Sequence, residues 1–306
     1  MSAAREAPGR LAPPSGFDAN TPRDRARRIL SGALAEAGVP SADLDARLLL
    51  CAALGLDHAG LLRDPGAPLG ARGAQALERM AARRLAREPT SRILGAREFW
   101  GARFHLGPAA LDPRPDTETL VEVVLDAVGA ETGRAWRILD LGVGSGALLC
   151  ALLASLPNAF GVGVDLAPAA CAIADRNLAA QGLQGRGKLI CADWAAPLEA
   201  RSAARFDIIV SNPPYISRGD IARLEPEVRI YDPLLALDGG EDGLDAYRAV
   251  IPTAARLLAP EGFVALEIGQ GQGKDVDALL RDASFSARNF RLDLGGVERI
   301  ILAKFA

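Results

Sequence analysis

From residue 136 to the end of the chain, short apolar runs alternate with longer stretches of helical period, which is the pattern of a mostly parallel α/β sheet. Seven runs are strand candidates, and the last two would close one edge of the sheet: Arg137–Leu141, Phe160–Asp165, Lys188–Cys191, Phe206–Ser211, Gly262–Ile268, Arg288–Asp293 and Glu298–Ala303. Residues 113–306 are therefore predicted to form one α/β domain.

Residues 22–89 have a helical pattern broken by turns, which predicts a small helical domain. Ser41 is expected to cap the second of its helices. The apolar face of that helix would hold Leu44, Leu48 and Leu49. A third, Arg-rich helix is expected at Ala74–Arg87. No cluster of catalytic side chains occurs here, so binding or scaffolding is the expected role.

Residues 90–112 are predicted to form a hairpin linker. Phe99 and Trp100, near its turn, would either pack the hairpin or wall a substrate pocket, and both alternatives stay open. Beyond the hairpin, Asp116 or Thr117 would cap a helix that runs to Val128. Residues 1–21 contain proline and glycine but no apolar signal-peptide core, and are predicted to be a disordered tail.

Composition and charge exclude several classes of protein. No uncharged run of about 20 apolar residues is present, so no membrane crossing is expected. The net charge of −3 divides into +4 for residues 1–100 (15 Arg against 11 acids) and −7 for the rest (20 basic residues against 27 acids). The front end is thus too weakly basic for a dedicated DNA binder. The four cysteines lack a Cys-x-x-Cys pair, which predicts no disulfide framework, no metal site and a cytoplasmic setting.

The most informative segment is Asn212-Pro213-Pro214-Tyr215, directly after the apolar run that ends at Ser211. A buried parallel strand would place it at the sheet edge where ligands of open α/β sheets bind. Consecutive prolines lack N–H donors and keep the backbone extended, so the loop would present carbonyl acceptors rigidly. A planar NH2 group fits such a site, with acceptors from Asn212 and Pro213 and an aromatic face from Tyr215.

A glycine loop follows the first strand and reads Asp140-Leu141-Gly142-Val143-Gly144-Ser145-Gly146. Glycines let the backbone turn sharply and approach a ligand closely. The G-x-G-x-G spacing is neither that of a dinucleotide loop nor that of a Lys-bearing P-loop. It argues against a pyrophosphate or triphosphate ligand.

Acidic residues follow the next two strands. Asp165 ends the second strand, where a carboxylate can accept hydrogen bonds from both hydroxyls of a ribose. Asp193 and Trp194 follow the third strand and are placed to meet an adenine. Together with the glycine loop and the Asn-Pro-Pro-Tyr loop, they predict S-adenosylmethionine as the cofactor.

With these motifs, the chain resembles class I methyltransferases that methylate amino groups, and more narrowly the bacterial peptide chain release factor glutamine methyltransferases. The resemblance covers about residues 25–306. It rests on the glycine loop, the acidic positions, the Asn-Pro-Pro-Tyr loop and the following segments: Glu88-Pro89, Arg97 through Trp100, Pro113 through Glu118, Leu235 through Gly240 and Asp242 through Leu244. Val143 departs from the family, which usually has a hydroxyl residue there.

The resemblance implies a small N-terminal helical domain that helps dock the substrate, followed by a Rossmann-like, seven-stranded class I methyltransferase sheet. Gly142 to Gly146, Asp140, Asp165, Asp193, Trp194 and Asn212 would hold S-adenosylmethionine. Asn212 to Tyr215 would hold the glutamine of the Gly-Gly-Gln motif of peptide chain release factors, with Phe99, Trp100 and Arg114 beside it. Asn212, Pro213 and Tyr215 would carry the catalysis, with no catalytic base.

Other functions fit parts of the same pattern. Glutamine methylation of a ribosomal protein and adenine-N6 methylation of DNA would use a similar loop. DNA methylation normally adds a basic target-reading region, and no sequence-specific nucleic acid binding is expected here. A non-catalytic binding module for an adenosyl ligand is the alternative from another class, although such a module needs no site that orients an amide.

Overall fold

The computed structural model describes residues 17–194, 198 and 205–305. Contacts divide the chain into two units. The helical unit holds residues 17–95 and 225–231, and the sheet unit holds residues 96–224 and 232–305. The sequence prediction placed 225–231 in the α/β domain and ended the helical domain at residue 89. The predicted tail lies outside the described residues up to residue 16, but residues 17–21 are part of the helical unit, where the Thr21 carbonyl accepts a hydrogen bond from Leu69.

The helical unit packs its helices around one apolar core built on Leu30, Leu34, Leu49, Leu50 and Leu77, all fully buried. Its elements are α1 (Arg23–Glu36), α2 (Ala42–Leu54), α3 (His58–Arg63), α4 (Gly70–Leu85), α5 (Thr90–Leu94) and α10 (Pro226–Tyr231). The three predicted helices correspond to α1, α2 and α4, but α4 spans Gly70–Leu85 rather than Ala74–Arg87. The helices α3 and α5 were not predicted, and α5 lies in the range that was assigned to the hairpin linker.

The predicted apolar face of α2 is wrong for two of its three residues. Leu49 is buried as predicted, but Leu44 and Leu48 are 46% and 39% exposed. The other buried positions are Ala42, Asp45, Ala46 and Leu50. The prediction failed because Asp45 lies on the inward face of the helix, where a charged residue is not expected. Its carboxylate is buried there as a partner of Arg84 in an ion pair. Ser41 occupies the N-cap position, but its hydroxyl donates to Asp45 rather than capping the helix, so the predicted cap is also wrong.

Buried ion pairs hold α10 within the helical unit. Arg84 is only 4% exposed and contacts Asp45 at 2.8 Å and Glu227 of α10 at 3.0 Å. Arg87 donates to the same Glu227 carboxylate at 2.7 Å. The Tyr231 hydroxyl adds a 2.7 Å bond to the Ala86 carbonyl. A segment that lies far along the sequence therefore completes this unit.

The sheet unit begins with an antiparallel hairpin, β1 (Ala96–Phe99) and β2 (Ala102–His105), as predicted. A seven-stranded sheet follows in the order β5-β4-β3-β6-β7-β9-β8, in which β9 is antiparallel to both of its neighbours. The strands are β3 (Arg137–Leu141), β4 (Phe160–Asp165), β5 (Gly187–Cys191), β6 (Phe206–Ser211), β7 (Leu258–Glu267), β8 (Phe285–Leu292) and β9 (Glu298–Phe305). The predicted fold class is confirmed.

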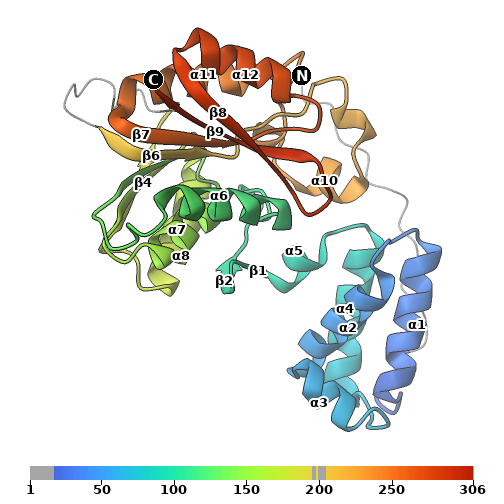
Figure 1. Ribbon diagram of the computed structural model, residues 1–306. Coiled ribbons are helices and arrows are strands. Elements are labelled where there is room, and N and C mark those ends of the chain that lie inside the picture. Colours follow the sequence, from blue (N-terminus) through green and yellow to red (C-terminus); the bar gives the residue numbers. More distant parts are fainter. Residues whose placement is uncertain (1–16, 195–197, 199–204, 306) are drawn as a thin grey trace. The chain divides into compact units, whose positions relative to one another are not determined.

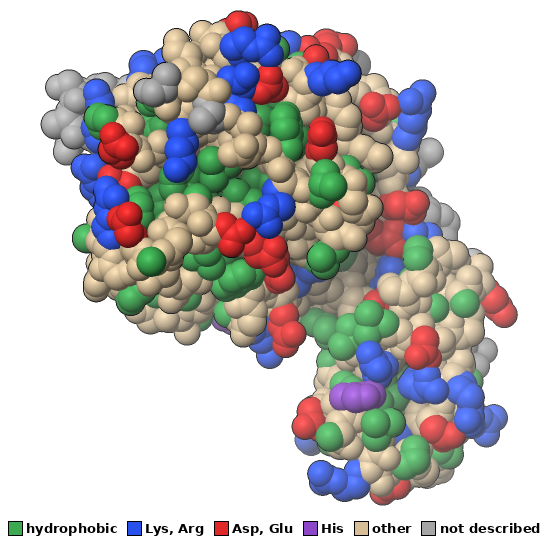
Figure 2. All heavy atoms as spheres, viewed as in Figure 1, with side chains coloured by type: hydrophobic (Ala, Val, Ile, Leu, Met, Phe, Trp, Pro, Cys, Tyr) green, Lys and Arg blue, Asp and Glu red, His purple; other side chains and the backbone are tan. Residues whose placement is uncertain are grey.

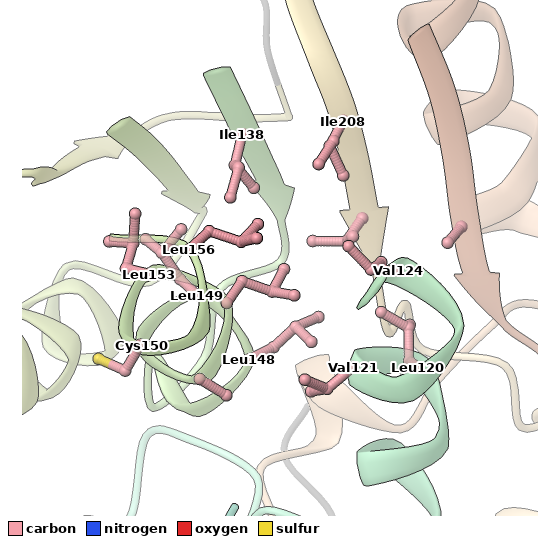
Figure 3. Packing of buried hydrophobic residues seen from close by; sticks show 14 of the residues in the cluster. Leu120, Val121, Val124, Ile138, Leu148, Leu149, Cys150, Leu153, Leu156 and Ile208 are labelled. Carbon is pink, nitrogen blue, oxygen red and sulfur yellow. The ribbon is translucent and has the colours of Figure 1, made fainter. Parts of the chain in front are cut away.

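Helices cover both faces of this sheet (Figure 1). On one face lie α6 (Glu118–Val128), α7 (Ala147–Ser155) and α8 (Pro168–Ala180), and on the other lie α11 (Asp245–Leu257) and α12 (Gly273–Asp282). Figure 3 shows the first layer, where side chains of α6 and α7 meet Ile138 and Ile208 of the central strands. This packing fixes the carboxyl ends of β3, β4 and β6, from which the site is built.

Further local predictions differ from the structure. β7 begins at Leu258 rather than at Gly262, because it follows α11 directly and a shift in the pairing of β6 with β7 accommodates the Pro260-Glu261-Gly262 segment. β8 begins at Phe285, before the predicted Arg288, since Ser284 ends the preceding turn with a φ of 70°. Asp116 or Thr117 was predicted to cap α6. Thr117, the last residue of the short helix η1 (Pro115–Thr117), does occupy the N-cap position of α6, but no side chain caps this helix.

Candidate active site

Two adjoining cavities lie at the carboxyl edge of the sheet, within the sheet unit. The larger has a volume of about 500 Å³, within the range of about 300–1,000 Å³ that small-molecule sites occupy. The smaller has about 70 Å³. Both are lined by Leu111, Gly142, Gly144 and Asn212. Asn212 therefore stands where a ligand of the larger cavity would meet one in the smaller.

The glycine loop between β3 and α7 has a backbone that only glycine adopts readily. Gly142, Gly144 and Gly146 have φ values of 80°, 53° and 79°. A side chain at Gly146 would also lie 3.0 Å from Ala174 of α8. The loop thus turns sharply beneath the cavities. Val143 and Ser145 are buried, and both line the smaller cavity.

Asp165 connects the glycine loop to the end of β4. Its carboxylate accepts the backbone N–H groups of Gly144 and Ala167, both at 2.9 Å. A carboxylate has about four acceptor positions, so two such bonds leave capacity for hydroxyl donors. Asp165, Asp193 and Trp194 all line the larger cavity, as their predicted roles require. Leu166, Ala192 and Leu235 add apolar lining.

Asp140 contributes a buried carboxylate to the smaller cavity. It is 1% exposed, and its Oδ2 has no hydrogen-bond partner. Burial, followed by the nearby charge of Asp165, raises the pKa of Asp140 to about 8. A buried carboxyl with one unpartnered oxygen favours a cationic or N–H-donating ligand.

Asn212, Pro213, Pro214 and Tyr215 extend from β6, and glycines pack against their backbone. A side chain at Gly239 would lie 2.9 Å from the Pro214 carbonyl oxygen, and one at Gly243 would lie 2.6 Å from that of Tyr215. Gln272 donates to the same Tyr215 carbonyl at 2.9 Å. The loop is thus held closely by segments that come later in the chain.

Two family models match separate parts of the chain. The PrmC N-terminal domain matches residues 25–95, and the methyltransferase small domain matches residues 115–224. These ranges end where the structure passes from one unit to the other, at Gly95 and at Leu224. The first model therefore covers most of the helical unit, and the second covers about half of the sheet unit.

Curated relatives match nearly the whole chain. The release factor glutamine methyltransferase of Rhodospirillum rubrum is 50% identical over 268 residues, covering 88% of this chain and 80% of the relative. That of Bradyrhizobium diazoefficiens is 47% identical over 283 residues, covering 92% and 94%. The chain belongs to the release factor glutamine methyltransferases. The resemblance inferred from the motifs is confirmed.

Solved structures with lower sequence identity share the fold of this methyltransferase. The 16S rRNA methyltransferase RsmC of T. thermophilus, in complex with AdoMet and guanosine, is 26% identical with a TM-score of 0.51, covering 69% of this chain and 50% of that one. The catalytic domain of human Mettl16 is 15% identical with a TM-score of 0.56, covering 74% and 81%. Both support the class I methyltransferase sheet.

Two buried residues that are linked to Asn212 by hydrogen bonds were not among the predicted site residues. The Thr117 hydroxyl accepts a hydrogen bond from the Asn212 side-chain nitrogen at 3.1 Å and donates to the Glu267 carboxylate at 2.6 Å. Thr117 is 6% exposed and Glu267 is 1% exposed. Thr117 had been assigned only to helix capping, and Glu267 lay inside a predicted strand, where its charge was the one available signal.

The hairpin and η1 supply the remaining predicted site residues. Phe99 and Arg114 line the smaller cavity, and Arg114 also contacts Asp232 at 2.7 Å. Phe99 also packs edge-to-face on Phe104, which is the hairpin packing that was one of the two roles left open. Trp100 does not line either cavity: its indole N–H donates to Ser155 and its ring packs against the core.

Two further findings concern metal ions and membrane spans. Within the described ranges, no three His, Cys, Asp or Glu side chains converge on a point where a metal ion could be held. None of the helices in these ranges combines the length and apolarity that a bilayer crossing would require.

Proposed function

We propose that the protein transfers a methyl group from S-adenosylmethionine to the side-chain amide nitrogen, N5, of the glutamine in the Gly-Gly-Gln motif of peptide chain release factors. The observation that carries the proposal is the orientation of Asn212. Its amide nitrogen is bound by Thr117 at the junction of the two cavities, which leaves its carbonyl oxygen to accept a hydrogen bond from a ligand.

On the donor side, the residues of the larger cavity suit an adenosyl group. Asp165 would accept ribose hydroxyls, and Asp193 and Trp194 would contact the adenine. Asp140 would hold the ammonium of the methionine part, which satisfies its unpartnered oxygen. When bound, S-adenosylmethionine supplies a methyl group already activated by its sulfonium.

On the acceptor side, the task is to orient a weak nucleophile. An amide nitrogen donates its lone pair into the carbonyl, so it attacks only when that overlap is reduced. Asn212 and the Pro213 carbonyl would accept both N–H groups and pull the nitrogen toward a pyramidal shape, and Tyr215 would pack on the amide plane. Alignment of this kind can lower a barrier by up to about 7–11 kcal/mol.

Proton accounting then needs no catalytic base. The nitrogen forms a bond to the methyl carbon as the carbon–sulfur bond breaks, and S-adenosylhomocysteine leaves with the electron pair. The nitrogen is transiently cationic and strongly acidic, so it loses one N–H proton to water. Asn212, Pro213 and Tyr215 act by position alone.

Charge favours a protein acceptor over DNA. The chain carries −7 over residues 101–306, and on the face shown in Figure 2 basic and acidic side chains are interspersed. A DNA methyltransferase gains much of its affinity from phosphate neutralisation by gathered Lys and Arg side chains. A translation factor as substrate also agrees with the cytoplasmic setting expected from the cysteines.

The test combines the purified protein, S-adenosylmethionine and a release factor, and maps methylation by peptide mass spectrometry. We expect one added methyl group on the Gly-Gly-Gln glutamine. Asn212→Ala should reduce the rate by at least about 100-fold, because the amide is no longer aligned. Methylation of a ribosomal protein or of DNA in place of the release factor would refute the proposal.

A further inference from the structure

A buried chain of hydrogen bonds runs beneath the Asn-Pro-Pro-Tyr loop. It links the Asn212 side-chain nitrogen to the Thr117 hydroxyl and that hydroxyl to the Glu267 carboxylate, over 3.1 Å and 2.6 Å. The Tyr215 side chain also faces the Glu267 carboxyl and acts to lower its pKa. Two residues of the loop thus depend on one carboxyl group at the end of β7.

The chemistry of these groups fixes which one donates and which one accepts in each hydrogen bond. An ionised carboxylate can only accept, so the single Thr117 hydroxyl proton must point at Glu267. The hydroxyl oxygen is then available to Asn212 only as an acceptor. Of the two ends of the Asn212 amide, the NH2 must therefore face Thr117, and the oxygen must face the cavities.

From this arrangement we propose that Thr117 and Glu267 are positioning residues that select the productive orientation of the Asn212 amide. The proposal rests on the proposed function, in which the Asn212 oxygen accepts an N–H of the substrate glutamine. Neither residue accepts a proton from the substrate, since each acts only through Asn212 or Tyr215.

Protonation of Glu267 would reverse the direction of these hydrogen bonds. A neutral carboxyl can donate to the Thr117 oxygen, and the Thr117 proton would then favour the oxygen of a flipped Asn212 amide. In that state the Asn212 NH2 would face the substrate NH2, and two donors cannot bond to each other. In Glu267→Gln, the side-chain NH2 would donate in the same way at every pH.

The surroundings of Glu267 put this change near neutral pH. The groups that face it are Thr117 and Asp116 from η1, Tyr215 from the loop, Arg299 from β9 and Tyr247 from α11, whose hydroxyl donates to the Glu267 backbone carbonyl. Burial raises the pKa of Glu267 to about 7, against the opposing effects of the Thr117 bond and the Arg299 charge. Tyr215 has a pKa of about 12 and stays neutral in this range.

The first part of the test concerns Thr117. Thr117→Val keeps the shape but removes the hydroxyl, and we expect kcat to fall by about 10- to 100-fold, as the loss of a charge-assisted hydrogen bond predicts. Thr117→Ser should restore kcat to within about threefold. Thr119→Val is the matched control, because Thr119 is 8% exposed in the same segment and lines neither cavity.

The second part concerns Glu267 and pH. In the wild-type protein, kcat should rise through a single acidic limb centred near pH 7. In Glu267→Gln, kcat should be low and this limb absent, while the dissociation constant for S-adenosylmethionine, measured by calorimetry, stays within about threefold. Unchanged cofactor affinity shows that the variant is folded.

Two results would overturn the proposal: a Glu267→Gln protein with wild-type kcat and the same acidic limb, or a Thr117→Val protein that loses cofactor affinity as much as kcat. A wild-type protein inactive on every release factor would instead refute the proposed function. The hydrogen bonds from Asn212 through Thr117 to Glu267 would still be tested by the NMR signals of the Asn212 side-chain NH2. These signals should shift in Thr117→Val, and they should stay unchanged if the hydrogen bonds do not exist.

Discussion

At the scale of single residues, Asp140 has the most unusual electrostatic environment in the site. It combines full burial, an unpartnered oxygen and the nearby charge of Asp165. At pH 7 its carboxyl is mostly protonated, because its pKa is raised to about 8. An ammonium placed beside it would favour the ionised form and lower that pKa.

Cofactor binding should therefore release protons. At pH 7, binding of S-adenosylmethionine should expel up to about one proton per protein, and the release should vanish above pH 9, where Asp140 is already ionised. Calorimetry in two buffers of different ionisation enthalpy measures the number. In Asp140→Asn the release should disappear. Equal release from this variant and the wild type would show that another group titrates.

The residues of the site differ in how well the sequence could predict them. The glycine loop and Asn212 to Tyr215 are contiguous motifs whose chemistry can be interpreted without a fold. Glu267 lies 150 positions from Thr117, and Thr117 lies 95 positions from Asn212. No short sequence pattern indicates such a contact, because it forms only when folding brings η1 and β7 together. The same reason explains why Trp100 was expected near the substrate but packs on α7.

At the scale of elements, the Asn-Pro-Pro-Tyr loop is shaped by the segment that follows it. Gly243 has a φ of 79° and touches the Tyr215 backbone so closely that an added Cβ would lie 2.6 Å from its carbonyl oxygen and 2.7 Å from Gln272. A side chain there would move Tyr215 or break the Gln272 bond that holds it.

Gly243→Ala should therefore reduce kcat by up to about 100-fold, since displacements of about 1 Å have this effect on alignment. Gly219→Ala is the matched control, because nothing lies within 4 Å of its Cβ position and its φ is not positive. Steady-state kinetics of both variants on a release factor would decide. Equal kcat values for the two variants would contradict this account of the loop.

Strands and helices were predictable wherever an apolar run or a helical period is long. The central strands β3, β4 and β6 match their predicted bounds, because each is buried on both faces and reads as continuous apolar sequence. The helix α10 was not predicted, since six residues are too few for a periodic signal. Its place in the helical unit depends on Glu227, whose partners are remote in sequence.

At the scale of the whole molecule, Glu227 stabilises the helical unit. Burial acts to raise its pKa, but hydrogen bonds from Arg87 and Arg84 outweigh this, and the pKa lies below its usual value. Its contribution to stability is therefore present above the ordinary pKa of a glutamate, about 4.3, and is lost as pH falls through the lowered pKa.

Glu227→Gln should destabilise the helical unit at pH 7 by about 1–3 kcal/mol, because the buried Arg84 and the half-buried Arg87 keep only a weaker acceptor. Hydrogen exchange of α4 amides would report the opening free energy of this unit. The difference from wild type should shrink below pH 4. Glu225→Gln is the control, since its side chain is 74% exposed and should contribute little. Equal destabilisation by both would rule out a specific role for Glu227.

The discontinuous origin of the helical unit has a consequence for how the nascent chain matures. Domains usually fold in the order in which the ribosome releases them. Here α1 to α5 emerge early, but their Arg84 and Arg87 meet Glu227 only after residue 231 has been made. By then β3 to β6, with the Asn-Pro-Pro-Tyr loop, have already been synthesised. The first unit to begin folding during translation is thus completed only after most of the second has appeared.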